Sequence, residues 1–178
     1  MEVCQIEQYS DAEWCDDLSS DAYFAKVLTW AGWRPARQEL EWSRIRETVL
    51  QKPLSEMGSH TVPYSLPWQR NWYALLASHL RTNRITAADF VTSLRRMGRE
   101  DAKRTLLRVV HSSEEKIVEC WLRDVVRLPA FPIDGRVREV LKRFHIPDDS
   151  DLVVECAERL GIPAREFARA VYENAEEL

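Results

Sequence analysis

Glycine is scarce in this sequence and long apolar runs are missing, and both absences narrow the class of protein. Only five of the 178 residues are glycine, and no apolar stretch approaches the roughly 20 residues that cross a bilayer. Alternating runs of β-branched residues, which are typical of strands, are also missing. Apolar residues instead recur at helical spacing along nearly the whole chain. We therefore expect one all-α domain, spanning residues 1–178, with no membrane span.

The four cysteines have spacings that fit neither a zinc site nor an iron–sulfur cluster, because none of them forms a C-x-x-C pair. They are Cys4, Cys15, Cys120 and Cys156. The first residues lack the basic start and the apolar stretch of a secretory signal. We expect reduced thiols, no metal, no cofactor and an intracellular location.

Charge is distributed unevenly along the chain. Residues 1–65 have a net charge of −5, residues 66–145 of +7, and residues 146–178 of −6. Arginine supplies 13 of the 16 basic residues in the middle part, and its planar fork matches phosphate oxygens well. We expect a basic face suited to a polyanion, flanked by the acidic N-terminal part and the acidic C-terminal helices.

The apolar pattern predicts a series of helices joined by short turns. They cover residues 21–33, 38–51, 68–80, 87–97, 99–110, 113–126, 135–144, 150–160 and 164–175. The predicted N-caps are Thr86, Asp134 and either Asp149 or Ser150. In the second of these helices we expect Leu40, Ile45 and Leu50 to face the core. Three prolines and Gly58 predict a loop over residues 53–67.

Two short motifs carry the chemical information. Lys116 lies in EEKIV (residues 114–118), and Asp134, 18 residues later, lies in PIDGRV (residues 132–137). The pair resembles the lysine and aspartate motifs of the helix-hairpin-helix DNA glycosylase superfamily. The nearest branch is that of the archaeal 8-oxoguanine DNA glycosylases, whose last helix begins with a Gly-Ile-Pro like residues 161–163. The resemblance extends from about residue 72 to residue 172.

The resemblance implies two packed helical lobes with the active site between them. It also implies a monomeric bifunctional glycosylase and AP lyase that acts on double-stranded DNA containing a damaged base. Lys116 would attack the sugar and form a Schiff base, and the carboxylate of Asp134 would stabilise the positive charge that develops on the sugar. A lysine is nucleophilic when burial or cationic neighbours lower its pKa, and Arg123 is the candidate neighbour.

Both residues also have ordinary structural interpretations. Asp134 before Gly135 is a good N-cap. Lys116 is placed to pair with Glu119 three residues later on the helix surface.

The base pocket implied by the resemblance is only partly matched. Tyr172, Cys120 and Arg123 are its candidate residues; Tyr172 stands where the branch has a stacking tryptophan, and Arg123 where it has a lysine. Ala168 stands near the position of a base-binding acid, and Glu166 lies on a different helix face. The resemblance points to 8-oxoguanine, read with looser selectivity than in the branch. The N7 hydrogen of this lesion needs a partner, for which a backbone carbonyl is one candidate; without such a partner the pocket would select by stacking and by ease of flipping.

Seven tryptophans are unusual for this length, and one or two are expected in the pocket, where a base can stack on them. Those in the N-terminal third are Trp14, Trp30, Trp33 and Trp42.

Contacts to DNA are expected along the basic middle of the chain. The candidates are Arg81, Asn83, Arg84, Ser112, Ser113, Arg136 and Lys142. Asn83, in the turn after the helix at 68–80, would fill the gap left by the flipped base. The hairpin before Lys116 has no glycine, unlike the common form in the superfamily, so we expect Ser112 or Ser113 to cap the second helix and its free amides to meet a phosphate.

Three alternatives remain open from the sequence. One is a glycosylase for another damaged base. Another is a catalytically inactive DNA-binding protein with the glycosylase fold. The third is a helical adaptor, which the basic middle of the chain disfavours.

Overall fold

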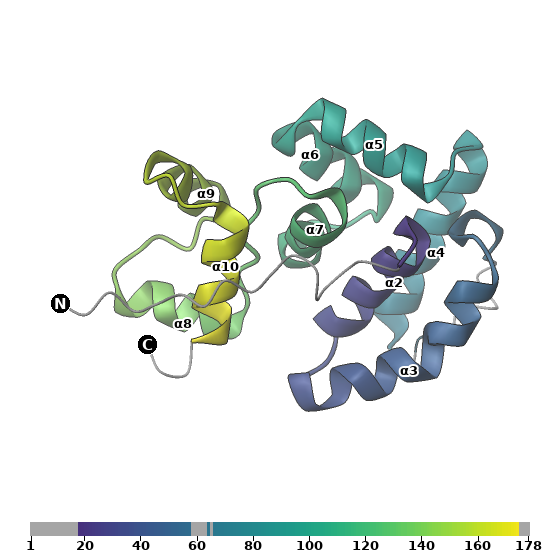
Figure 1. The fold of residues 1–178 in the computed structure, drawn as a ribbon, viewed down its shortest axis with the longest axis horizontal. Helices are drawn as coiled ribbons and strands as arrows, with labels where there is room; N and C mark the ends of the chain where they lie inside the picture. Colours follow the sequence, from purple (N-terminus) through teal and green to yellow (C-terminus); the bar gives the residue numbers. More distant parts are fainter. Residues whose placement is uncertain (1–17, 58–63, 65, 175–178) are drawn as a thin grey trace.

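The computed structural model describes residues 18–57, 64 and 66–174, and within them all regular structure is helical, as predicted. The α-helices are α2 (Ser20–Ala31), α3 (Pro35–Gln51), α4 (Pro67–Asn83), α5 (Ala87–Met97), α6 (Arg99–Val109), α7 (Glu115–Trp121), α8 (Gly135–Arg143), α9 (Ser150–Arg159) and α10 (Ala164–Glu173). A 3-10 turn, η1 (Leu54–Glu56), and a π-helical turn, η2 (Leu122–Val126), complete the set (Figure 1). None of the described helices is long and apolar enough to cross a membrane.

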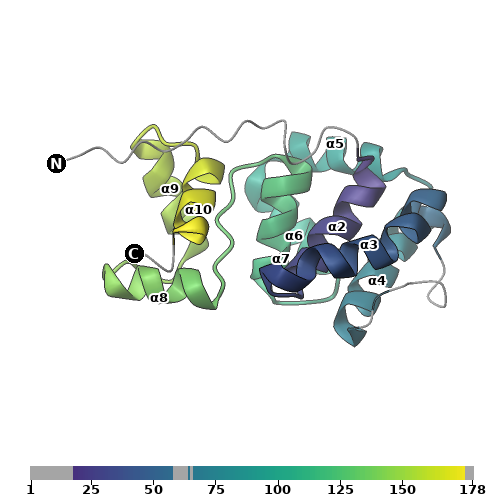
Figure 2. The ribbon, with the colours of Figure 1, turned by 60° about the horizontal axis from the view of Figure 1, so that its bottom comes forward.

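The helices form two lobes, each with its own apolar core (Figures 1 and 2). The N-terminal lobe contains α2 to α7 with η1 and η2, and its core ends at Ala130. The C-terminal lobe contains α8 to α10, and its core begins at Phe131. The extended segment from residue 127 to residue 134 therefore connects one core to the other.

The helix that carries Lys116 is anchored deep in the N-terminal lobe by Trp121. This side chain is fully buried, and its ring makes an edge-to-face contact with Phe24 at 5.4 Å. Its Nε1 donates to the carbonyl of Phe24 at 3.2 Å, which satisfies the buried indole N–H. α7 is thereby fixed against α2, the first helix described in the chain.

Side-chain caps set several helix starts, as the sequence predicts. Thr86 and Asp89 form a capping box at α5. Asp134 caps α8, and Asp149 rather than Ser150 caps α9.

Two predictions about the helices are wrong. In α3, Leu40 is 64% exposed and Leu50 48% exposed, whereas the inward stripe is Trp42, Ile45 and Val49. These three recur at i, i+3 and i+7, which is the spacing of one helix face. The predicted helix over 113–126 is also interrupted, because α7 ends at Trp121 and continues as the π-helical turn η2.

An ion-pair network, here called the interlobe network, joins the two lobes. It consists of Arg99 and Lys103 on α6, Glu119 on α7 and Asp151 on α9. Arg99 lies 3.1 Å from the carboxylate of Glu119 and 2.5 Å from that of Asp151. Lys103 lies 3.1 Å from Glu119 and 3.0 Å from Asp151. Two cations of one lobe thus hold an acid of their own lobe and an acid of the other.

The network also fixes the connecting segment. Glu119 accepts a hydrogen bond from the backbone N–H of Phe131 at 3.1 Å, and Arg99 donates to the carbonyl of Pro129 at 2.9 Å. Burial disfavours the charge of Lys103, but its bonds to Glu115, Glu119 and Asp151 outweigh that effect and hold its pKa above the usual value. The same cations lower the pKa of Asp151, although burial opposes them. Lys103 and Asp151 are therefore both charged at neutral pH.

We predict that Glu119→Gln destabilises the fold by about 3–5 kcal/mol, since it removes one partner of a buried charge cluster. Urea denaturation measures the loss. The matched control is Glu100→Gln, which removes a carboxylate that also pairs with Arg99 but is 65% exposed. That control is expected to change stability by no more than about 0.5 kcal/mol. Equal effects of the two substitutions would show that the network does not hold the lobes.

Candidate active site

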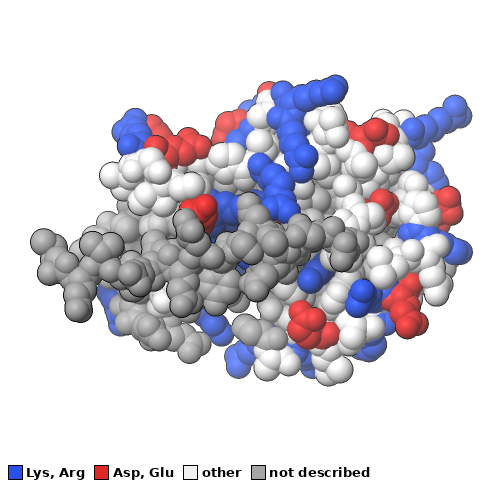
Figure 3. Space-filling view, viewed as in Figure 1, with Lys and Arg blue, Asp and Glu red and all other residues white. Residues whose placement is uncertain are grey.

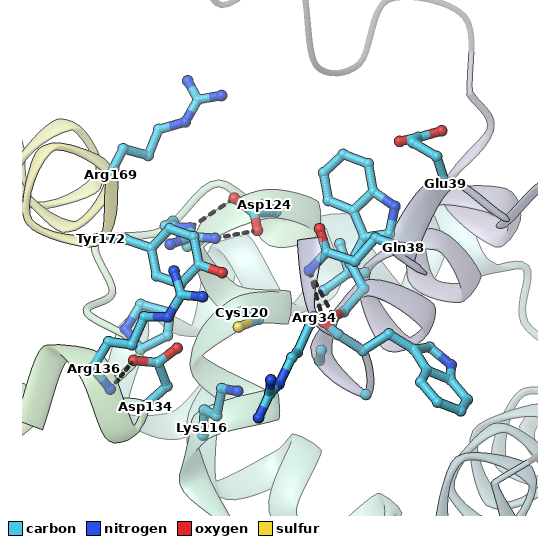
Figure 4. Close-up of a pocket in the computed structure, with 17 residues that line it drawn as sticks. Arg34, Gln38, Glu39, Lys116, Cys120, Asp124, Asp134, Arg136, Arg169 and Tyr172 are labelled. Carbon is cyan, nitrogen blue, oxygen red and sulfur yellow. Dashed lines mark hydrogen bonds and ion pairs between the residues drawn. The ribbon is translucent and has the colours of Figure 1, made fainter. Parts of the chain in front are cut away.

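A cavity of about 510 Å³ lies between the two lobes. Its walls come from the end of α2 and the start of α3, from α7 and η2, from the start of α8, and from α10 (Figure 4). The lining residues are Val27, Trp30, Ala31, Gly32, Trp33, Arg34, Gln38, Glu39, Lys116, Cys120, Arg123, Asp124, Pro132, Asp134, Arg136, Arg169 and Tyr172. The candidate catalytic pair and all three candidate base-pocket residues are therefore brought to one cavity.

Asp134 lies at the start of α8 and caps that helix. Its Oδ1 accepts from the backbone N–H groups of Arg136 at 3.0 Å and Val137 at 2.9 Å. In Figure 4 the second carboxylate oxygen points away from this bond. The cap and a role in the cavity are thus compatible, because they use different oxygens of one carboxylate.

Lys116 lies in the first turn of α7 and is partly buried at the wall of the cavity. The surface pair with Glu119 that the sequence allows is not formed, since Glu119 is 1% exposed and belongs to the interlobe network. Among the residues that the structure describes, Lys116 takes part in no ion pair. Its amine is therefore available to a ligand in the cavity.

Arg123, the candidate cationic neighbour of Lys116, is paired with an acid. Its guanidinium forms a bidentate ion pair with Asp124, in which Nε donates to Oδ1 at 2.8 Å and Nη2 donates to Oδ2 at 2.7 Å. Burial opposes its charge, but Asp124 outweighs burial and raises the pKa of Arg123. Cys120, one helical turn from Lys116, is a neutral thiol, because burial raises its pKa to about 11.

Tyr172 faces the cavity from α10. Burial and the nearby charge of Asp134 raise the pKa of its hydroxyl, so it remains protonated at neutral pH. The guanidinium of Arg136 lies over the ring, 5.9 Å from its centre. Arg136 is thus the one predicted DNA contact that reaches the cavity.

Several lining residues were not identified from the sequence. On α10, Ala168 is 3% exposed in the core of the C-terminal lobe, Glu166 is exposed, and Arg169 is the neighbour that lines the cavity. Arg169 and Tyr172 lie at i and i+3 and therefore share one helix face. Since Tyr172 was placed in the pocket, this spacing could have identified Arg169 as a lining residue. Arg34 and Gln38 were missed as well, because the start of α3 meets α7 only in the tertiary structure.

Trp30 and Trp33 supply the aromatic wall of the N-terminal lobe, which agrees with the expectation of one or two tryptophans in the pocket. Trp42 is 5% exposed in the core, and Trp14 lies outside the described residues.

The cavity carries more positive than negative charge. Its described lining includes five basic residues and three acidic ones, and one acid, Asp124, is already paired with Arg123. On the face shown in Figure 3, Lys and Arg side chains also cover more of the surface than Asp and Glu. An anionic ligand is favoured here.

The other predicted DNA contacts lie away from the cavity. Arg81, Asn83 and Arg84 are at the junction of α4 and α5, on the side of the N-terminal lobe remote from the C-terminal lobe (Figures 1 and 2). Asn83 is the last residue of α4, not part of the following turn, and its amide donates to the carbonyl of His79 at 2.8 Å. Lys142 is exposed near the end of α8.

The turn between α6 and α7 differs from what we expected. Neither serine caps α7: the N-cap is Glu114, whose N–H donates to Ser112 Oγ at 3.0 Å. His111 adopts a φ of 50°, the left-handed conformation that glycine favours. Among the described residues, a second cavity beside this turn is lined by seven acids and two basic residues, Lys116 and Arg138. Four of the acids are paired with Arg99, Lys103 or Arg138, and the other three, Glu114, Asp134 and Asp149, form no ion pair with a described residue. This side of Lys116 is therefore unfavourable for a phosphate.

We predict that Gly32→Ala destabilises the cavity wall. A Cβ at residue 32 would lie 2.3 Å from Gln69 Nε2. That amide is fully buried and is fixed by bonds to the carbonyls of Leu28 at 2.7 Å and Thr29 at 3.3 Å, so it has little room to move. The expected loss is about 1–3 kcal/mol by urea denaturation, as for overpacking.

The matched control is Gly135→Ala, because a Cβ at residue 135 meets nothing within 4 Å. Its stability is expected to stay within about 0.5 kcal/mol of the parent. If Gly32→Ala were tolerated equally well, the close packing of Gln69 against residue 32 would not constrain the wall.

Comparison with known proteins adds no assignment for this cavity. No family model matches the chain, and neither a curated protein nor a solved structure matches it. A proposal about function therefore depends on the residues of the cavity and on the resemblance of the two motifs.

Proposed function

We propose that the protein is a DNA glycosylase with AP-lyase activity that excises a damaged base. The expected substrate is 8-oxoguanine. The observation that carries this proposal is the meeting of Lys116 and Asp134 in one cavity with three aromatic side chains. Lys116 belongs to the N-terminal lobe and Asp134 to the start of the C-terminal lobe. Their spacing in the sequence does not by itself bring them into one cavity, whereas the packing of the two lobes does.

The residues present suit each step of the reaction. As the N-glycosidic bond breaks, the base leaves with the bonding electrons and positive charge develops on the sugar, where the Asp134 carboxylate stabilises it. The Lys116 amine forms a bond to C1′, the C1′–O4′ bond then breaks, the proton released from the nitrogen goes to O4′, and a protonated imine remains. A C2′ proton then passes to water, and the 3′ phosphate leaves with the electrons of the C3′–O bond, which cleaves the strand. No metal or cofactor is required.

The size and walls of the cavity suit an extruded base. Its volume of about 510 Å³ is within the usual range for small-molecule sites, roughly 300–1,000 Å³. Trp30 and Trp33 from one lobe and Tyr172 from the other line the cavity with aromatic rings. Lys26 lies over the Trp30 ring, 4.5 Å from its centre, and Arg37 over the Trp33 ring at 3.9 Å, so a base would stack on the opposite face of either tryptophan.

Charge indicates where the strand would pass. Arg34, Arg136 and Arg169 line the cavity, whereas the acidic second cavity lies on the other side of Lys116. We therefore place the phosphates on the arginine side and not at the turn between α6 and α7.

Lys116→Gln is expected to abolish covalent trapping by borohydride on DNA containing 8-oxoguanine, because the imine requires a primary amine. The matched control is Lys52→Gln, an exposed lysine at the end of α3 outside the cavity, which should trap like the parent. Trapping that survives in Lys116→Gln would exclude this lysine as the nucleophile. A parent that binds DNA in a salt-dependent way but never traps would favour the inactive DNA-binding alternative.

Asp134→Asn is expected to slow base excision by a factor of order 10², since it removes one transition-state electrostatic contact. Stability should change little, because Asn and Asp cap helices about equally well. The same substitution at Asp149, the cap of α9, is the control and should affect neither property. Single-turnover excision and urea denaturation measure the two effects. A mutant that is fully active but less stable would restrict Asp134 to capping.

A further inference from the structure

The amide of Gln38 is held in one orientation at the start of α3. Its Nε2 donates to the carbonyl of Trp30 at 3.0 Å and to that of Trp33 at 3.0 Å. Both partners are acceptors, so only the nitrogen of the amide can face them. The oxygen, Oε1, must therefore point the other way.

The other way is into the cavity. Gln38 is one of the lining residues, and Figure 4 shows its two bonds on one side of the amide and its oxygen on the other. Tyr172 lies on the opposite side of the cavity, in the other lobe (Figure 4). Among the described residues, none donates a hydrogen bond to Oε1. A ligand between the two lobes would thus meet a fixed, neutral acceptor.

Other lining side chains are less suited to accept from a neutral ligand. The arginines and Lys116 have only donors. Asp124 is occupied by Arg123. Asp134 uses one oxygen as the cap of α8, and its other oxygen is the one assigned to the sugar. Glu39, the third acid of the described lining, is exposed, and no ion pair with a described residue holds its carboxylate in one orientation. Gln38 combines acceptor capacity with an orientation fixed before the ligand arrives, and pre-organised groups lose less free energy on binding.

We propose that Gln38 Oε1 reads the extruded base by accepting a hydrogen bond from a ring N–H. This role depends on the proposed glycosylase function and names the chemistry that the site selects. A purine oxidised at C8 carries a hydrogen on N7, whereas N7 of guanine is an acceptor. Opposite Oε1, the oxidised purine forms a bond and guanine places two acceptors face to face. Gln38 therefore separates the lesion from the normal base.

Two substitutions distinguish recognition of the base by Gln38 Oε1 from the structural role of Nε2, which binds the carbonyls of Trp30 and Trp33. Gln38→Lys keeps donors for the carbonyls of Trp30 and Trp33, where a cation near a helix C-terminus is favourable, but has no acceptor. Gln38→Met removes both donor and acceptor. Leu40→Lys is the control, because it adds the same charge to α3 at a position that is 64% exposed and outside the cavity.

The experiment compares two readouts for each variant: single-turnover excision of 8-oxoguanine, and borohydride trapping on DNA that already contains an abasic site. Both Gln38 variants are expected to excise 8-oxoguanine about 10- to 100-fold more slowly, as for an unsatisfied polar partner. Trapping at the abasic site should remain within about threefold of the parent, because no base needs to be read there. Leu40→Lys should retain both activities.

Excision at the parent rate by Gln38→Lys would overturn the proposal and leave Gln38 as an anchor of the turn between α2 and α3. A parent that traps at abasic sites but spares 8-oxoguanine would also overturn it, with Lys116 still in place. A parent that traps at neither substrate would instead refute the glycosylase function, and the role of Gln38 with it.

Discussion

The buried carboxylate of Glu119 holds the parts of the molecule that the candidate site requires. It lies three residues after Lys116 on α7, and it binds the N–H of Phe131, three residues before Asp134. One side chain thus ties the helix of the lysine to the segment that ends at the aspartate. Its charge is compensated by Arg99 and Lys103, which also hold Asp151 of the C-terminal lobe. A lone buried carboxylate would be strongly unfavourable, so the cations and the geometry of the two lobes depend on one another.

This arrangement places Lys116 and Asp134 between a region of positive and a region of negative electrostatic potential. Both residues line two cavities, one with an excess of basic side chains and one with an excess of acids. An anionic strand is attracted to the first side and repelled from the second. The turn between α6 and α7 lies on the acidic side, so an anion is less favoured there than beside the arginines of the first cavity.

The sequence predicted what local chemistry determines. The capping residues Thr86 and Asp134 were identified because a cap depends on neighbours two or three residues away. The inward face of α3 was predicted wrongly at two of three positions, because Leu40 and Leu50 are exposed and the buried stripe is Trp42, Ile45 and Val49. The interruption after Trp121 also escaped prediction, since a π-helical turn has no apolar period of its own.

The candidate site likewise combines residues that the sequence pattern identified with one that only the tertiary structure brings there. The spacing of Lys116 and Asp134 identified the pair, whereas Gln38 joins them from a segment nearly 80 residues earlier in the chain. Its position depends on how α2 ends. The last carbonyls of a helix lack partners within the helix. Two glutamine amides donate to carbonyls here, Gln69 to those of Leu28 and Thr29, and Gln38 to those of Trp30 and of Trp33 in the turn that follows. The backbone N–H groups of Gly32 and Trp33 add bonds to the carbonyls of Thr29 and Trp30. Gly32 allows this close approach because it has no Cβ to meet Gln69. The end of α2 and the start of α3 therefore bring Trp30, Trp33 and Gln38 together on one wall of the cavity, and Tyr172 lines the same cavity from the other lobe.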